Sequence, residues 1–311
     1  MKKFFINILK FAAFAIPFYI IGLCIWSWIM PPFLAKNVRS NIAAYGHFFS
    51  RSRDAENIKN PDILFLGSSH AYRGFDTRVF SEANISSFNL GSSAQSPINS
   101  QVLLKQYLQK INPKLVVYEV YAGTLSIDGV ESSLDILSNG KIDKNALDMT
   151  LKLNNILSYN TLFYGYFRQV FNLNKNLKEP AKQNEDFYIK GGGFVETTYR
   201  QYNPEHLKKT KWEISPSQID ALKENIKILK DNKTPYILVQ APVTQTLYNS
   251  KTNNKEVDDL LKKLGPYKNF QNEIVLDDKK DFYDNNHMNQ EAVVKFNLKF
   301  IEYLKSQNIK F

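Results

Sequence analysis

The sequence contains very little cysteine and histidine, with one cysteine, Cys24, and four histidines among 311 residues. A single cysteine excludes a disulfide within the chain and excludes zinc sites built from several cysteines and histidines. It does not decide the compartment, because a reducing compartment and a bacterial envelope protein without disulfides both fit. We therefore expect a fold stabilised by its hydrophobic core alone.

Dense basic runs are also missing, although the chain carries a net charge of +10. Its 40 Lys and Arg residues are scattered, and no zinc-finger or RNA-binding signature accompanies them. We expect no nucleic-acid partner, and favour a solvated basic face near anionic lipids or glycans. The 43% apolar and 23% charged residues are typical of a globular protein, and neither repeats nor low-complexity tracts interrupt them.

One long uncharged run is present, the twenty residues from Phe11 to Met30. This is about the length that crosses a hydrocarbon core of ~30 Å. A cleaved signal peptide is the alternative, but its apolar region is usually only about 7–15 residues, and no small-x-small site precedes Pro31. We predict an uncleaved transmembrane helix in residues 1–32. Lysines before the run favour a cytoplasmic N-terminus, although Lys36 and Arg39 beyond it weaken that asymmetry.

After a juxtamembrane linker, residues 33–60, strand-like and helix-like segments alternate. Short apolar runs bounded by turn residues predict five strands, at Ile63–Leu66, Ser87–Leu90, Leu115–Val120, Pro235–Val243 and Glu273–Leu276. Helical spacing predicts helices at Pro97–Ile111, Ser217–Lys233, Lys255–Leu264 and about Gln290–Ser306. This alternation predicts one three-layer α/β/α domain, residues 61–311, with a mostly parallel five-stranded sheet.

Residues 122–215 break this alternation, with weak helical patterns and many Asn, Lys and Tyr residues. We interpret them as an insertion that forms a lid or a substrate platform. Its Gly191-Gly192-Gly193 run lacks the strand-to-helix context of a phosphate loop, so we expect a flexible hinge there.

A serine motif, Gly67-Ser68-Ser69-His70, directly follows the first predicted strand. In parallel sheets, ligands bind beyond the carboxyl ends of the strands. A serine at this turn can project its hydroxyl into that crevice, beside backbone N–H groups that bind a developing oxyanion. The motif alone also fits an ordinary helix cap. We expect His70 to be a helix-start residue or a substrate contact rather than a general base.

A second motif, Asp284-Asn285-Asn286-His287, lies between the last predicted strand and the last helix. Three-residue spacing lets the carboxylate of Asp284 hold the imidazole of His287, whose other nitrogen is then free to take a proton from serine. A polar loop with an Asn helix cap is the alternative. Asp281 could substitute for Asp284, but its spacing from His287 is worse.

A third motif, Asn89-Leu90-Gly91-Ser92, ends the second predicted strand. A glycine there allows the backbone to approach a ligand and donate its N–H. A strand-ending turn is the alternative. We treat Asn89 and Gly91 as candidate oxyanion or substrate-binding residues. For Arg73 and Asp76, just beyond the serine, we prefer an ion pair to a substrate contact.

The order of these motifs resembles the SGNH (GDSL-like, flavodoxin-like) hydrolase family over about residues 61–121 and 216–308. The resemblance implies Ser69 as nucleophile, the N–H groups of Ser69 and Gly91 as oxyanion donors, His287 as base and Asp284 as its partner. It implies no metal and no other cofactor. The chain departs from the family in two places: Ser68 stands where aspartate is common, and the third-block asparagine is missing from Tyr118–Gly123.

Gly-Ser-Ser together with a membrane anchor is similar to a subgroup of bacterial envelope proteins, which act in polysaccharide O-acetylation and teichoic acid D-alanylation. That similarity implies an esterase or O-acyltransferase at the inner membrane, facing the periplasm. It implies an envelope polysaccharide or acylated glycan as substrate and a multi-pass membrane-bound O-acyltransferase as partner. Two alternatives remain open: a degenerate, glycan-binding scaffold, and an α/β-hydrolase, which fits poorly because Ala71 replaces the second glycine of its nucleophile motif.

Overall fold

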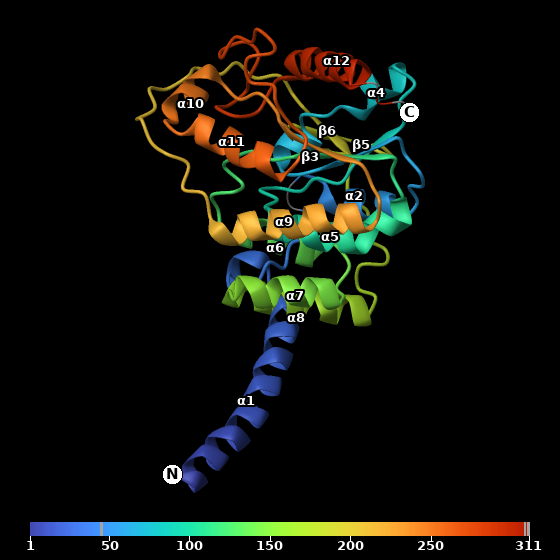
Figure 1. Cartoon of the computed structure of the whole chain (residues 1–311). Helices are drawn as coiled ribbons and strands as arrows, with labels where there is room; N and C mark the ends of the chain where they lie inside the picture. Colours follow the sequence, from blue (N-terminus) through green and yellow to red (C-terminus); the bar gives the residue numbers. More distant parts are fainter. Residues whose placement is uncertain (44–45, 308, 310–311) are drawn as a thin grey trace.

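A computed structural model describes residues 1–43, 46–307 and 309 (Figure 1). Its central sheet has five strands in the order β2-β1-β3-β7-β8, and every neighbouring pair is parallel. The strands are β1 (Ile63–Leu66), β2 (Ser87–Asn89), β3 (Leu115–Glu119), β7 (Tyr236–Gln240) and β8 (Tyr267–Asn269). Helices cover both faces, which confirms the expected three-layer α/β/α architecture.

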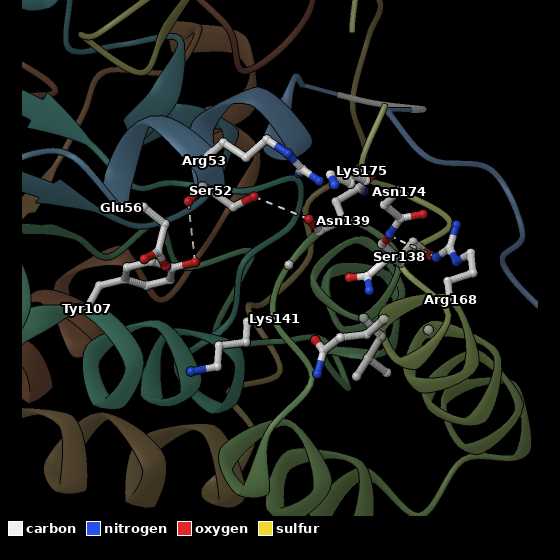
Figure 2. A pocket seen from close by; sticks show the side chains of 15 residues that line it. Ser52, Arg53, Glu56, Tyr107, Ser138, Asn139, Lys141, Arg168, Asn174 and Lys175 are labelled. Carbon is white, nitrogen blue, oxygen red and sulfur yellow. Dashed lines mark hydrogen bonds between the residues drawn. The ribbon is translucent and has the colours of Figure 1, made fainter. Parts of the chain in front are cut away.

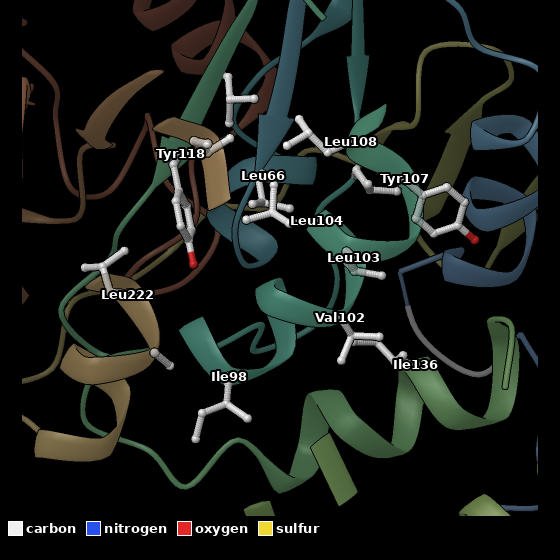
Figure 3. Packing of buried hydrophobic residues seen from close by; sticks show 14 of the residues in the cluster. Leu66, Ile98, Val102, Leu103, Leu104, Tyr107, Leu108, Tyr118, Ile136 and Leu222 are labelled. Atoms are coloured by element: carbon white, nitrogen blue, oxygen red, sulfur yellow. The ribbon is translucent and has the colours of Figure 1, made fainter. Parts of the chain in front are cut away.

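The inner strands are buried on both faces because their alternate apolar side chains enter two different cores. Leu64 and Leu66 of β1 pack toward α5 (Pro97–Ile111) and α9 (Pro216–Asp231), the side that Figure 3 shows. Ile63 and Phe65 pack toward the opposite layer. The opposite layer contains α4 (Thr77–Glu82) and α12 (Gln290–Ser306). The remaining elements of the α/β domain are α3 (Ser69–Tyr72), α10 (Gln245–Ser250) and α11 (Asn254–Leu264).

The fifth strand lies elsewhere than the sequence predicted. Residues 273–276 form no strand, and the side chain of Val275 is 97% exposed. The edge position beside β7 is taken by residues just after α11: the carbonyl of Pro266 accepts from Leu238 N–H at 2.8 Å, and Phe270 N–H donates to Gln240 O at 3.0 Å. β8 has the sequence Tyr-Lys-Asn and is only half-buried, so an apolar-run criterion cannot detect it.

The insertion contains a helical part and a small sheet. The helices α6 (Val130–Asn139), α7 (Lys144–Leu153) and α8 (Ile156–Val170) pack together beneath α5. The strands β4 (Lys182–Gln183), β5 (Asp186–Ile189) and β6 (Phe194–Thr197) form an antiparallel sheet.

The glycine run before β6 is a packed corner and not the flexible hinge that we expected. Gly192 O accepts from Asn89 N–H at 2.9 Å, which fixes this turn to β2. Gly193 has φ +72°, and an added Cβ would lie 2.2 Å from Asn89 O, so only glycine fits.

Part of the expected juxtamembrane linker, residues 33–60, is packed into the folded domain. Helix α2 (Phe48–Ala55) is largely buried, and Arg51 has no exposed surface. The Arg51 guanidinium donates to Gly193 O at 2.7 Å and to Gly91 O at 3.0 Å. This arginine therefore joins the segment to the insertion and to the turn after β2.

The N-terminal helix α1 (Lys2–Ile29) projects from the domain (Figure 1). It is long and apolar enough to cross a membrane, with a mean hydropathy of 2.2 over its most apolar window. Its last turns are partly covered, since Leu23, Cys24 and Ser27 are buried. A short 3₁₀ helix, η1 (Pro32–Leu34), follows it.

Two substitutions test the revised position of the fifth strand. Leu238 of β7 is fully buried, so Leu238→Ala should lower the free energy of unfolding by about 2–5 kcal/mol. Val275→Ala should change it by less than about 0.5 kcal/mol, because that side chain is exposed. Urea unfolding of the full chain in detergent measures both. A large loss from Val275→Ala would contradict the position of β8.

Candidate active site

Ser69 is placed by a strained turn at the carboxyl end of β1. Gly67 has φ +141°, and a Cβ there would lie 2.8 Å from Glu119 Cβ and 2.8 Å from Glu119 O. The turn therefore passes directly against β3, which only glycine allows. Ser68 then caps α3, because its Oγ accepts from His70 N–H at 3.2 Å. Within the described part of the chain, the N–H of Ser69 has no hydrogen-bond acceptor.

His287 and Asp284 lie on one turn just before α12. Asp284 Oδ1 accepts from the backbone N–H groups of Asn286 at 2.8 Å and His287 at 2.7 Å. Its second oxygen, Oδ2, lies 2.8 Å from His287 Nδ1. The three-residue spacing therefore brings carboxylate and imidazole together, as the sequence predicted.

The structure also brings Ser69 to this pair, with its Oγ 2.7 Å from His287 Nε2. This distance falls within the range of about 2.6–3.2 Å that proton transfer from serine to histidine requires. The three residues Ser69, His287 and Asp284 thus form a continuous hydrogen-bonded chain, and two of them are 218 residues apart in sequence.

The charge of Asp284 fixes which atoms donate and which accept in the hydrogen bonds that join Ser69, His287 and Asp284. Burial acts to raise the pKa of Asp284, but its hydrogen bonds and charge interaction with His287 outweigh burial, and the pKa falls below its usual value. An ionised carboxylate can only accept, so the imidazole proton resides on Nδ1 of His287. Nε2 is then the acceptor for the Ser69 hydroxyl.

His70 belongs to the surroundings of this chain and makes no hydrogen bond to it. Its buried ring stacks on Tyr121 at a centroid distance of 4.1 Å and lies 5.1 Å from the His287 ring. Burial, and next the proximity of His287, hold the pKa of His70 well below its usual value. His70 is therefore neutral at physiological pH, which suits a packing role rather than that of a base.

The geometry at Asn89 and Gly91 differs from our expectation. Asn89 is fully buried, its Nδ2 donates to Ala71 O at 2.7 Å, and its Oδ1 accepts from Gly91 N–H at 3.1 Å. The Gly91 N–H is thus already used, and neither residue lines the pocket that contains Ser69. Gly91 instead permits close packing, since a Cβ would lie 3.0 Å from the carbonyls of Gly67 and Ser68. Of the two expected oxyanion donors, the Ser69 N–H is the free one.

Glu119 is a buried acid that we did not predict at this site. It ends β3, near where the SGNH resemblance led us to expect an asparagine, and its Oε2 accepts from Ser68 Oγ at 3.0 Å. Burial raises the pKa of Glu119 to about 8, although the hydrogen bonds from Ser68 oppose this shift. The one sequence signal was an acidic residue at the end of the apolar run Leu-Val-Val-Tyr-Glu.

A pocket of about 360 Å³ contains all three residues of the hydrogen-bonded chain. The insertion supplies much of its wall, with Gln183, Asn184, Glu185, Asp186 and Thr197. Arg73 ties this wall to α3, because its guanidinium binds the Asp186 carboxylate through two bonds of 2.5 and 2.6 Å. Arg73 is therefore an ion-paired residue of the pocket wall. Asp76 does pair locally, with Arg78 at 2.6 Å.

A separate pocket of about 350 Å³ is lined by none of Ser69, His287 and Asp284 (Figure 2). It lies between α2 and the end of α8, and its charged lining includes Arg53, Lys141, Arg168 and Lys175. Among the described residues, no cluster of three or more His, Cys, Asp or Glu side chains has the geometry to hold a metal ion.

The chain matches solved structures at low sequence identity. No family model and no curated protein matches the chain. Solved structures similar to the chain include a GDSL-like lipase from Bacteroides thetaiotaomicron and a lipase/acylhydrolase from Enterococcus faecalis. The first has 9% identity and a TM-score of 0.42, over 84% of this chain and 98% of that one. The second has 11% identity and a TM-score of 0.39, over 80% and 97%. At these values the likeness carries no argument about activity.

Glu119 makes a pH dependence of stability testable. With a pKa of about 8 in the folded protein against 4.5 normally, the folded state holds a proton that the unfolded state releases. Stability from this group is full below pH 4.5 and falls as the pH rises toward 8. Glu119→Gln should remove that decline. Urea unfolding of both proteins across this range measures it, and parallel pH curves would show that Glu119 is not protonated in the fold.

Proposed function

We propose that this chain is a serine esterase or O-acyltransferase in which Ser69 is the nucleophile, His287 the general base and Asp284 its orienting partner. The observation that carries the proposal is the continuous chain of hydrogen bonds from Ser69 Oγ through the His287 ring to Asp284, at 2.7 and 2.8 Å. Serine is a weak nucleophile at neutral pH, and an adjacent base held by a third group is what activates it.

In the proposed reaction, the Ser69 oxygen attacks an ester or thioester carbonyl while His287 Nε2 takes its proton. The N–H of Ser69, which has no acceptor among the described residues, stabilises the oxyanion. The intermediate collapses as His287 returns the proton to the leaving oxygen or sulfur, and the acyl group remains on Ser69. His287 then deprotonates water or a sugar hydroxyl, which attacks the acyl-enzyme. The bond from the acyl carbon to Ser69 Oγ breaks as His287 returns this proton to Oγ.

For the substrate we propose an acylated polysaccharide of a bacterial cell envelope. The pocket supports this, because Arg73, Asn184, Asp186 and Thr197 give it a polar wall suited to sugar hydroxyls. The apolar helix α1 supports single-pass anchoring, and the lysines at its N-terminus support an extracytoplasmic domain at the inner membrane. We further propose a multi-pass membrane-bound O-acyltransferase as acyl donor partner, which rests on the similarity to anchored envelope SGNH proteins.

A non-catalytic, glycan-binding role is the second candidate. One observation favours it: the Gly91 N–H is bound to Asn89, and a third-block asparagine is missing, so one expected oxyanion donor is left. Loss of one such donor typically lowers kcat by about 10²–10³. The assembled Ser69, His287 and Asp284 weigh against this role, because glycan binding does not require that arrangement.

Fluorophosphonate labelling of the full chain in detergent, read by peptide mass spectrometry, separates the two candidates. An activated serine should give a single adduct on Ser69, and Ser69→Ala and His287→Ala should abolish it. Ser93→Ala is the matched control, because Ser93 lines the same pocket without contacting His287, and this variant should label normally. No adduct on the wild-type protein would favour the non-catalytic role.

The orienting role of Asp284 predicts a specific loss of rate. Asp284→Asn should lower the rate of p-nitrophenyl acetate cleavage by about 10²–10⁴, because the amide favours the wrong tautomer of His287. Asp281→Asn is the control: Asp281 binds Lys295 at 3.0 Å and the Asp277 N–H, outside the hydrogen-bonded chain. Equal losses of activity in both variants would contradict the assigned role.

A further inference from the structure

Exposed apolar side chains are concentrated at one end of the molecule. Beyond residues 1–29, fourteen large apolar or aromatic residues of the described chain are exposed, and ten of them lie in or beside η1, α7 and α8. We call this set the basal patch: Phe33, Leu34, Leu147, Leu151, Ile156, Tyr166, Val170, Phe171, Leu173 and Leu177. Soluble surfaces rarely gather apolar side chains in this way, so the patch indicates a partner.

In both helices of the patch, α7 and α8, exposed apolar side chains lie on the face that points away from the domain. In α7, Leu147 and Leu151 are one turn apart and exposed, whereas Ala146, Met149 and Thr150 are buried against the domain. In α8, Tyr166 and Val170 repeat the four-residue spacing on its outer face. The outer faces of both helices therefore carry apolar side chains that do not pack into the hydrophobic core.

The membrane-spanning candidate leaves the domain from this same end. Tyr19 Oη donates to Asn160 Oδ1 at 3.1 Å, and Leu23 and Cys24 form a small core with Tyr164 of α8. Figure 1 shows α7 and α8 lying crosswise to α1 where it emerges. An apolar groove of about 740 Å³ beside α1, lined by Phe14, Phe18, Trp26 and Leu34 among others, continues the patch along the helix.

The length of α1 fixes the level of the bilayer. The contacts with α8 begin at Tyr19, so seventeen helical residues, 2–18, stand clear of the domain. At 1.5 Å per residue even all seventeen cover only ~26 Å, and they include the lysines that precede the uncharged run, whereas the hydrocarbon core is ~30 Å thick and needs about 20 residues. A bilayer crossed by α1 must therefore reach the level of α8.

We propose that the basal patch lies on the surface of a lipid bilayer, with its apolar side chains among the lipid headgroups and upper acyl chains. Lys36, Lys152, Lys175 and Lys178 occur in the same segments, and such mixtures of apolar and basic residues suit an anionic membrane surface. The protein is then held by a helix across the membrane and by a second, monotopic contact that fixes the orientation of the domain. This inference rests on the proposed anchoring by α1 and not on the chemistry of Ser69.

Depth-dependent quenching tests the proposal in the full chain. Single cysteines at Leu151 and Phe171, in a Cys24→Ala background, would carry an environment-sensitive NBD fluorophore in nanodiscs of phosphatidylcholine and phosphatidylglycerol, with one protein per disc. Leu298→Cys, an exposed leucine of α12 outside the patch, is the matched control, and Phe14→Cys reports on α1 itself. Doxyl-labelled lipids should quench the probes at 14, 151 and 171 at least about threefold more than the probe at 298.

Each other outcome has a distinct meaning. Quenching at 14 with water-like behaviour at 151 and 171 would overturn the proposal while leaving the anchor in place. Blue-shifted but unquenched probes at 151 and 171 would indicate protein contact instead of lipid, which also overturns it. No quenching at 14 would remove both the anchor and the proposal. Fluorophosphonate labelling of Ser69 reports on the proposed chemistry independently of all these results.

Discussion

The attachment of α12 to the segment that follows Ser69 determines whether the site can exist. Asn297 of α12 is fully buried, its Nδ2 donates to Gly74 O at 2.6 Å, and its Oδ1 accepts from Asp76 N–H at 2.7 Å. Phe75, between those two positions, stacks on Phe65 of β1 at 4.5 Å and contacts Phe296 at 5.2 Å. His287 lies three residues before the start of α12, and Ser69 lies three residues after the end of β1, so these contacts help to set the distance between the two side chains. The segment after Ser69 and the segment before α12 therefore lie side by side, and Asn297 joins them through its two hydrogen bonds.

Three titratable groups around Ser69 differ in charge because their surroundings differ. Asp284 keeps its charge through its bonds to His287, whereas burial keeps Glu119 protonated and His70 neutral near pH 7. Asp284 is therefore the charged group that contacts the His287 ring, which orients the imidazole for proton transfer from Ser69. The neutral Glu119 supports the turn through Ser68 without adding a second negative charge close to a nucleophile that must develop an oxyanion.

Local patterns predicted most of the elements and the three residues that meet. Apolar runs bounded by turn residues predicted β1 and β3, and regular spacing predicted α5 and α12, because buried parallel strands and amphipathic helices have distinct periods. Ser69 was found because its motif follows a strand end. Asp284 and His287 were found from their three-residue spacing ahead of a predicted helix, since the strand expected before them, residues 273–276, does not form. The features that the sequence did not predict depend on contacts between residues that are not identified by local patterns. The half-buried edge strand β8 carries no apolar run, Asn89 binds Gly91 by a turn geometry that composition does not specify, and Arg51 is buried only because Gly91 and Gly193 accept its bonds.

The central claim is that Ser69 forms a covalent acyl intermediate with the help of His287. Its most direct test is pre-steady-state cleavage of p-nitrophenyl acetate by the full chain, with rapid acid quenching and peptide mass spectrometry. The account predicts a burst of p-nitrophenol stoichiometric with the protein, and an acetyl group on the peptide that contains Ser69. The burst and the acetyl group should both be absent from Ser69→Ala and from His287→Ala. A wild-type time course without a burst, and with no acetyl group on Ser69 at any time, would contradict it.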